Sequence, residues 1–133
     1  MTEEIPSLAK QVGKKIDPNF APKIDFNPER ERFFDAASRF VNSLASRLAN
    51  RLDTHLEAIA KTNWATFRES GDQSMYVRSL AQTLHETVPI IGETITNPVY
   101  FRSFCDGLAA AFLKKFQAQV SKCKRVGSFS AFF

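Results

Sequence analysis

Residues 27–61 carry the sequence NPERERFFDAASRFVNSLASRLANRLDTHLEAIAK, which decides the fold class. Asn27 and Pro28 are typical of a helix start, because asparagine caps a first turn and proline fits its first position. Apolar residues then recur at steps of three and four, the period of one helix face. They are Phe33, Ala37, Phe40, Val41, Leu44, Leu48, Leu52, Leu56 and Ile59. We therefore predict one long amphipathic helix over residues 28–61.

The spacing of the leucines in this face indicates a bundle helix. Leu44, Leu48, Leu52 and Leu56 follow one another in steps of four. A two-stranded coiled coil needs alternating steps of four and three to keep its seam facing the partner helix. The predicted helix therefore fits a bundle better than a long coiled coil.

A second amphipathic segment is predicted to begin at Asp72 or Ser74, since either side chain can cap a helix. Pro89 lacks a backbone donor, so we expect it to kink or end this helix at residues 87–88. Its apolar face consists of Tyr76, Val77, Leu80, Leu84, Val88 and Ile91.

A third helix is predicted from Pro98 to about Lys124, with Asn97 as its cap. Gly107 is the weak position within it. Its apolar stripe consists of Phe101, Phe104, Cys105, Leu108, Phe112, Phe116, Val120 and Cys123. Strand-like alternation is absent, and the sequence predicts an all-α bundle of about three main helices.

The 133 residues fit one domain with flanking segments. We interpret residues 1–27 as a flexible linker with a short helix at residues 7–15, because their charge is mixed and periodicity is weak. Residues 28–125 form the predicted bundle domain, and residues 126–133 are predicted to be an irregular tail. The sequence does not decide whether the chain is complete or truncated there. The sequence has neither a secretory signal nor an apolar run near the roughly 20 residues that span a bilayer. A cytoplasmic protein is expected.

The sequence contains none of the common catalytic motifs. Its two histidines, His55 and His85, form no metal-binding pair at helical spacing, and the patterns HExxH, GxSxG, GxGxxG and the P-loop are missing. Cys105 and Cys123 on one helix would stand about five turns apart, too far for a disulfide and without zinc-site spacing. We therefore expect no enzyme activity, no cofactor and no metal.

The net charge of +4 is concentrated near the C-terminal end. Everything after Asp106 is free of acidic residues and carries a basic cluster of Lys114, Lys115, Lys122, Lys124 and Arg125. Such a cluster can contact an anionic surface, although a solubilising helix end is the simpler interpretation. The alternative function is therefore a peripheral membrane-binding helical module that acts through this basic end.

Nucleic-acid binding is a third and weaker hypothesis. The arginines within residues 28–61 alternate with Glu29, Glu31, Asp35, Asp53 and Glu57. This pattern is typical of a salt-bridged exterior, and no nucleic-acid-reading motif accompanies it. We expect no nucleic-acid partner.

Residues 64–125 resemble a known family through an ordered set of short elements. They are GDQS at 71–74, Tyr76-Val77, Val88-Pro89-Ile90-Ile91, Tyr100-Phe101, Phe104-Cys105-Asp106, Phe112, Lys115-Phe116 and Lys122-Cys123-Lys124. This set is similar to the C-terminal region of the family of vacuolar protein sorting-associated subunit 53, part of the Golgi-associated retrograde protein (GARP) tethering complex.

The resemblance implies a non-catalytic piece of a tethering-complex helical rod, in a complex that captures endosome-derived vesicles at the trans-Golgi network. It implies other subunits of that complex and SNAREs or small GTPases as partners, with peripheral placement on trans-Golgi network and endosome membranes. The same subunit also serves an endosomal recycling complex, and the sequence does not choose between the two. In the family a Leu-rich helix follows the Lys122-Cys123-Lys124 element, whereas this sequence departs from that pattern at residues 126–133.

Overall fold

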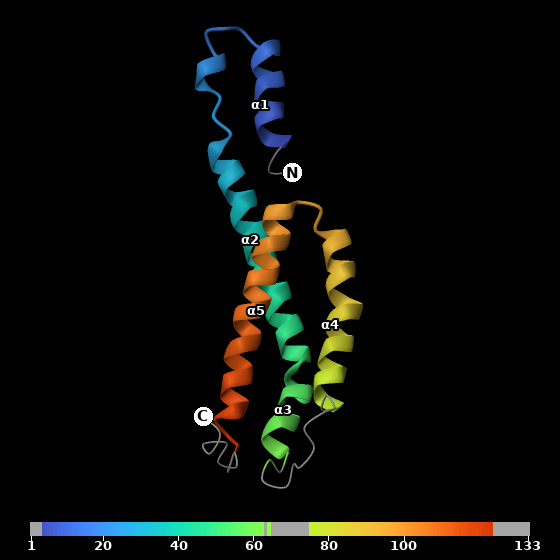
Figure 1. The fold of residues 1–133 in the computed structure, drawn as a ribbon. Helices are drawn as coiled ribbons and strands as arrows, with labels where there is room; N and C mark the ends of the chain where they lie inside the picture. The colour runs from blue at the N-terminus through green and yellow to red at the C-terminus, as the bar shows by residue number, and fades with distance from the viewer. Residues whose placement is uncertain (1–3, 63, 65–74, 124–133) are drawn as a thin grey trace, which may run out of the picture. The chain divides into compact units, whose positions relative to one another are not determined.

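A computed structural model describes residues 4–62, Trp64 and residues 75–123. Its elements, in chain order, are α1 (Glu4–Lys15), the short 3₁₀ helix η1 (Ala21–Lys23), α2 (Asn27–Arg51), α3 (Asp53–Lys61), α4 (Met75–Thr94) and α5 (Pro98–Val120) (Figure 1). The described residues contain no strand, and the all-α fold class is confirmed. None of the described helices is both long and apolar enough to cross a membrane.

The chain divides into two compact units, Met1–Phe40 and Val41–Phe133. The first unit contains α1, η1 and the start of α2, and the second contains the rest of α2 with α3, α4 and α5. The short helix expected at residues 7–15 is present as α1, which begins three residues earlier, at Glu4. The division into a linker at 1–27, a bundle domain at 28–125 and a tail at 126–133 stays a prediction.

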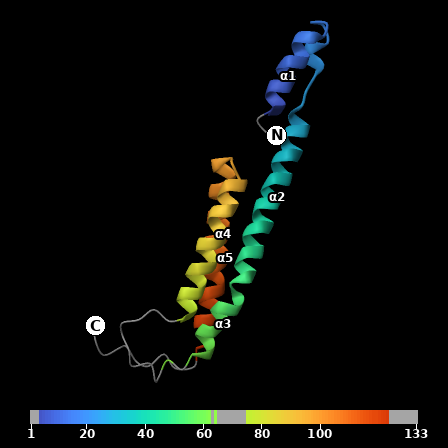
Figure 2. The same ribbon diagram turned by 90° about the vertical axis from the view of Figure 1, so that its right-hand side faces the viewer.

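The hydrophobic core of the second unit lies along α2 and α3. One cluster joins α2 to α4 and α5 through Val41, Ala45, Leu48, Ala49, Ile91, Phe104 and Leu108. The other joins α3 to α4 through Leu52, Leu56, Ile59 and Leu80, with Phe112 of α5 packed against it. In Figures 1 and 2, α4 and α5 run in opposite directions, and α3 packs against both of them. The predicted apolar faces therefore meet in one bundle core.

The predicted single helix over residues 28–61 is interrupted at Leu52, so that α2 ends at Arg51 and α3 begins at Asp53. The Leu52 N–H donates to the Ala49 carbonyl at 3.2 Å, three residues back, which is the tighter 3₁₀ pattern. Leu52 itself is fully buried. The apolar stripe thus continues through the interruption, which is why periodicity alone did not reveal it.

Of the two outcomes predicted for Pro89, a kink or a helix end, the helix end is wrong, because α4 continues to Thr94 with Pro89 inside it. A proline leaves the carbonyl of the residue four positions earlier without its helical partner, and here that residue is His85. Both His85 and Pro89 are exposed, so water can take the place of the missing donor. The predicted caps at Asp72 and Ser74 lie outside the described residues.

The predicted start of α5 is confirmed. The side-chain oxygen of Asn97 accepts hydrogen bonds from the backbone N–H groups of Val99 at 2.9 Å and Tyr100 at 3.4 Å, and Pro98 occupies the first position. The helix ends at Val120, short of the expected Lys124. A Cβ built on Gly107 would lie 3.5 Å from the Ala45 side chain, so α5 and α2 approach closely there.

The N-terminal part of the predicted α2 face is not core. Phe33 and Phe40 are 45% and 64% exposed, whereas the first buried residue of α2 is Val41. The apolar period begins before Val41, but the buried residues of α4 and α5 cluster with α2 only from Val41 onward. Helical spacing identified which side of α2 is apolar. It did not show that α4 and α5 cover this side only from Val41 onward.

Candidate functional site

The predicted anionic-surface contact is distributed along the end of α5. Lys114 and Lys115 stand in its last turns, and Lys122 follows the helix end. Lys114 and Lys122 are exposed, whereas Lys115 is partly buried. Lys124 and Arg125 lie outside the described residues. The role of the five cations as an anionic-surface contact stays a prediction.

Lys115 is engaged with a carboxylate of a different helix. Its Nζ donates to both carboxylate oxygens of Asp53, at 2.8 Å and 2.7 Å. The two side chains are 28% and 41% exposed, so solvent still reaches the pair. Asp53 also lies in the first turn of α3, where the positive end of the helix dipole favours a carboxylate. The charge of Lys115 is therefore matched within the bundle, and Lys114 and Lys122 are the described members of the cluster that face solvent.

The pairing partner of Lys115 was missed by sequence reasoning, which placed Asp53 on a solvated helix face. No local signal marks it, because the two residues are 62 positions apart. By contrast, Glu57 and Lys61 are four residues apart on one helix, a spacing that indicates an ion pair, and their charged groups lie 3.3 Å apart. Ion pairs within a helix follow from spacing, whereas this one depends on how α3 packs against α5.

The remaining polar groups near the core have structural partners. The Trp64 indole N–H donates to the Ile59 carbonyl at 2.9 Å, and the Cys123 thiol lies 3.6 Å from the same carbonyl oxygen. Both contacts close the C-terminal end of α3, whose last carbonyls have no partner within the helix. Trp64 and Cys123 therefore stabilise the C-terminal end of α3 and its packing in the bundle.

Among the described residues, no three histidine, cysteine, aspartate or glutamate side chains lie close enough together to hold a metal ion. Cys105 and Cys123 are both free thiols in partly buried positions, and His55 is partly buried on α3. The described residues that can contact a partner are the exposed lysines near the end of α5 and several exposed apolar side chains.

Comparison with known proteins finds relatives that include the following two. The chain is 31% identical over 124 residues to vacuolar protein sorting-associated protein 53 A of Arabidopsis thaliana, an alignment that covers 93% of this chain and 15% of that protein. It is 27% identical over 111 residues to the vacuolar protein sorting-associated protein 53 homolog of Caenorhabditis elegans, covering 83% of this chain and 14% of that protein. No family model matches the chain. No solved structure matches it either.

The chain is thus an all-α segment that is similar to two vacuolar protein sorting-associated proteins. It is homologous to vacuolar protein sorting-associated protein 53 over most of its length, which confirms the resemblance found in residues 64–125 and is consistent with the C-terminal region of that family. The chain spans about 15% of the length of the curated relatives it matches.

Proposed function

We propose that this chain is a non-catalytic segment of a subunit of a multisubunit vesicle-tethering complex, acting in retrograde transport from endosomes to the trans-Golgi network. The observation that carries the proposal is homology to protein 53 over 93% of the chain. As a GARP-type subunit it would reside peripherally on trans-Golgi network and endosome membranes. Its partners would be other subunits of the complex and SNAREs or small GTPases.

The arrangement of polar groups supports a scaffold role. Asp53 and Lys115 join α3 to α5, and Trp64 closes the end of α3. These are connections between elements of a helical support, and catalysis would require polar groups that converge in a pocket. A tethering subunit holds its partners at a fixed distance and does not change them chemically. Contacts that fix its helices relative to one another suit this role.

The alternative function, a membrane-binding module acting through the basic end, is weakened by the engagement of Lys115 with Asp53. A cation near an anionic bilayer contributes roughly 1 kcal/mol. With Lys115 engaged, the other four cations of the cluster would contribute at most roughly 4 kcal/mol, which corresponds to no more than a millimolar affinity. This surface can assist a protein that has further contacts, and we keep it as the second candidate.

Relocation in cells tests the proposed function. The chain is fused to a mitochondrial outer-membrane anchor, and endosome-derived and secretory vesicles are counted at mitochondria by microscopy. We expect endosome-derived vesicles to accumulate and secretory vesicles not to. A matched control is the Phe104→Asp variant, which removes the folded core and should abolish capture.

Equal accumulation of both vesicle types, or none, would contradict a role in this transport step. Capture that persists in the Phe104→Asp variant would show that the folded bundle is not responsible. Capture that is lost on replacing Lys114 and Lys122 with glutamate would instead favour the membrane-binding alternative.

A further inference from the structure

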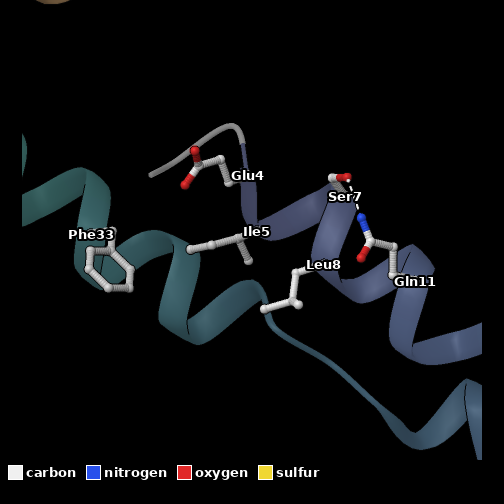
Figure 3. Close-up of a pocket in the computed structure, with 6 residues that line it drawn as sticks. All are labelled: Glu4, Ile5, Ser7, Leu8, Gln11 and Phe33. Atoms are coloured by element: carbon white, nitrogen blue, oxygen red, sulfur yellow. Dashed lines mark hydrogen bonds between the residues drawn. The ribbon is translucent and has the colours of Figure 1, made fainter.

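Two helix segments are attached to their neighbours through partly exposed side chains. In the first unit, Ile5 and Leu8 of α1 line an open groove of about 460 Å³ and are directed toward the α2 side, where Phe33 lies (Figure 3). Glu4 also lines this groove, and nothing in the structure shows what covers it, so it indicates no particular ligand. The second segment is the end of α5, where the contacts with α3 are more specific.

The last two turns of α5 are only partly covered by the bundle. Phe116 and Val120 are 36% and 40% exposed, although they continue the apolar stripe of the helix. Among the described residues beyond Phe112, Cys123 is the apolar side chain that packs against the core cluster around Leu52. The attachment of this helix end to the bundle therefore depends largely on Cys123.

Cys123 meets the end of α3 at a backbone carbonyl that also binds Trp64. Its Sγ lies 3.6 Å from the Ile59 carbonyl oxygen, which accepts a hydrogen bond from the Trp64 indole N–H at 2.9 Å. A carbonyl oxygen has two lone pairs and can accept from both donors. The indole ring also meets the ring of Tyr76 in α4 edge to face, with centroids 6.5 Å apart. One oxygen atom thus connects the ends of α3 and α5 with a tryptophan whose ring contacts α4.

The Cys123 thiol has a second acceptor within its own helix. Its Sγ lies 3.5 Å from the Gln119 carbonyl oxygen, one turn earlier. A thiol carries one hydrogen, so it can donate fully to only one of the two oxygens. If the contact with Ile59 is broken, the thiol keeps a partner at Gln119, and no unsatisfied donor opposes the separation. The end of α5 therefore has two arrangements available, one joined to α3 and one satisfied within α5.

We propose that the Ile59 carbonyl is a latch that holds the end of α5 against α3, and that Trp64 keeps this latch closed. The last carbonyls of a helix have no partner within it, and helix ends fray. The Trp64 indole fixes the Ile59 carbonyl in the position at which Cys123 meets it. When the latch opens, the exposed Lys122 moves with Cys123, so the latch sets where this part of the basic end lies. This inference concerns the end of α5 and does not depend on the proposed function.

Alkylation of the two cysteines tests the latch on the full chain of 133 residues, because a partly buried thiol reacts when its surroundings open. Iodoacetamide labelling of each cysteine is followed by mass spectrometry, with Cys105 in the first half of α5 as the internal reference. Trp64→Phe removes the indole N–H and keeps an aromatic ring. We expect it to raise the labelling rate of Cys123 about fivefold, the effect of one hydrogen bond, and to leave that of Cys105 within about twofold.

Thr62→Val is the matched control at the same helix end. The Thr62 hydroxyl donates to the Ala58 carbonyl at 2.7 Å, one residue before Ile59. Valine has nearly the same shape and removes this donor without touching the latch. We expect labelling of Cys123 to stay within about twofold of the unmodified chain.

Amide hydrogen exchange gives a second measurement with a second variant. The N–H groups of Ser121 and Lys122 donate to carbonyls of α5 and report on opening of its end. Both should exchange about fivefold faster in Trp64→Phe. Cys123→Ala removes the other donor of the latch and should make them exchange about threefold faster or more, since a thiol is a weak donor.

Unchanged labelling of Cys123 in Trp64→Phe would overturn the inference. An equal rise at Cys105 would overturn it as well, because the whole bundle would then have loosened. An equal rise in Thr62→Val would assign the effect to fraying of α3 alone and exclude the latch. Unchanged amide exchange at residues 121 and 122 in both Trp64→Phe and Cys123→Ala would show that neither donor holds the end of α5.

Discussion

The Nζ of Lys115 lies 2.8 Å and 2.7 Å from the two carboxylate oxygens of Asp53, which stands 62 residues earlier in the chain. One ammonium group thereby ties α5 to the first turn of α3. Both side chains keep contact with solvent, which screens their attraction. The ion pair therefore fixes the position of α5 relative to α3, and it contributes only modestly to the free energy of unfolding.

Replacing Lys115 with methionine should lower the free energy of unfolding by about 1 kcal/mol, because the aliphatic stem is kept and the ion pair is lost. Urea unfolding followed by circular dichroism measures the change. Lys114→Met is the matched control, because Lys114 is the neighbouring residue and its side chain is exposed. We expect it to change the free energy of unfolding by less than about 0.5 kcal/mol. Equal losses in the two variants would show that the Asp53 contact contributes nothing specific.

Two phenylalanines offer a comparison of buried and exposed positions on the predicted apolar faces. Phe104 is fully buried, and its ring stacks on that of Phe101 with centroids 6.2 Å apart. Phe104→Ala should lower the free energy of unfolding by about 3–5 kcal/mol, and Phe104→Asp by more, since it would place an unpaired charge in the core. Phe40→Ala, at a side chain 64% exposed, should change it by less than about 1 kcal/mol. An unchanged melting temperature in Phe104→Asp would refute the described core.

These residues show what could be predicted from the sequence and what could not. Phe104 and Leu56 recur at helical spacing, and their burial follows from local pattern. Phe40 satisfies the same pattern and is exposed, because coverage depends on where distant helices begin and end. Pro89 was expected to kink or end α4, yet Pro89 is exposed to solvent and the helix continues past it to Thr94.

The same distinction holds for the candidate site. The five basic residues were evident as a charge cluster, but which of them are matched internally depends on helix packing. Asp53 could be assigned to Lys115 only after α3 and α5 were placed side by side. Periodicity identifies which residues of a helix share an apolar face. It does not show which charged residue of a distant helix lies next to a given lysine.

The cap of α5 provides a test of local structure. Asn97 accepts from the N–H groups of Val99 and Tyr100, which have no partner within the helix. Asn97→Ala should lower the free energy of unfolding by about 1 kcal/mol. Asn42→Ala, at an exposed position inside α2, should leave it unchanged or raise it slightly, because alanine has the higher helix propensity. A loss of the same size at Asn42 would argue against a capping role.

Gly107 and Gly92 both lie inside helices, and they should respond differently to alanine. A Cβ at Gly107 would lie 3.5 Å from the Ala45 side chain, an ordinary contact distance. Gly107→Ala should therefore raise the free energy of unfolding by about 0.5–1 kcal/mol through helix propensity. At Gly92 a Cβ would lie 3.2 Å from two ring atoms of Phe101, so the ring must shift.

Because Phe101 packs against the core cluster, that shift should offset the propensity gain, and Gly92→Ala is expected to give no net increase in stability. Urea unfolding of the two variants, measured side by side, decides the matter. If Gly92→Ala were stabilised as much as Gly107→Ala, the Phe101 ring would have room to move, and the close approach of α4 and α5 would not limit the side chain at position 92. If Gly107→Ala were destabilised, α2 and α5 would pack more tightly at Ala45 than described.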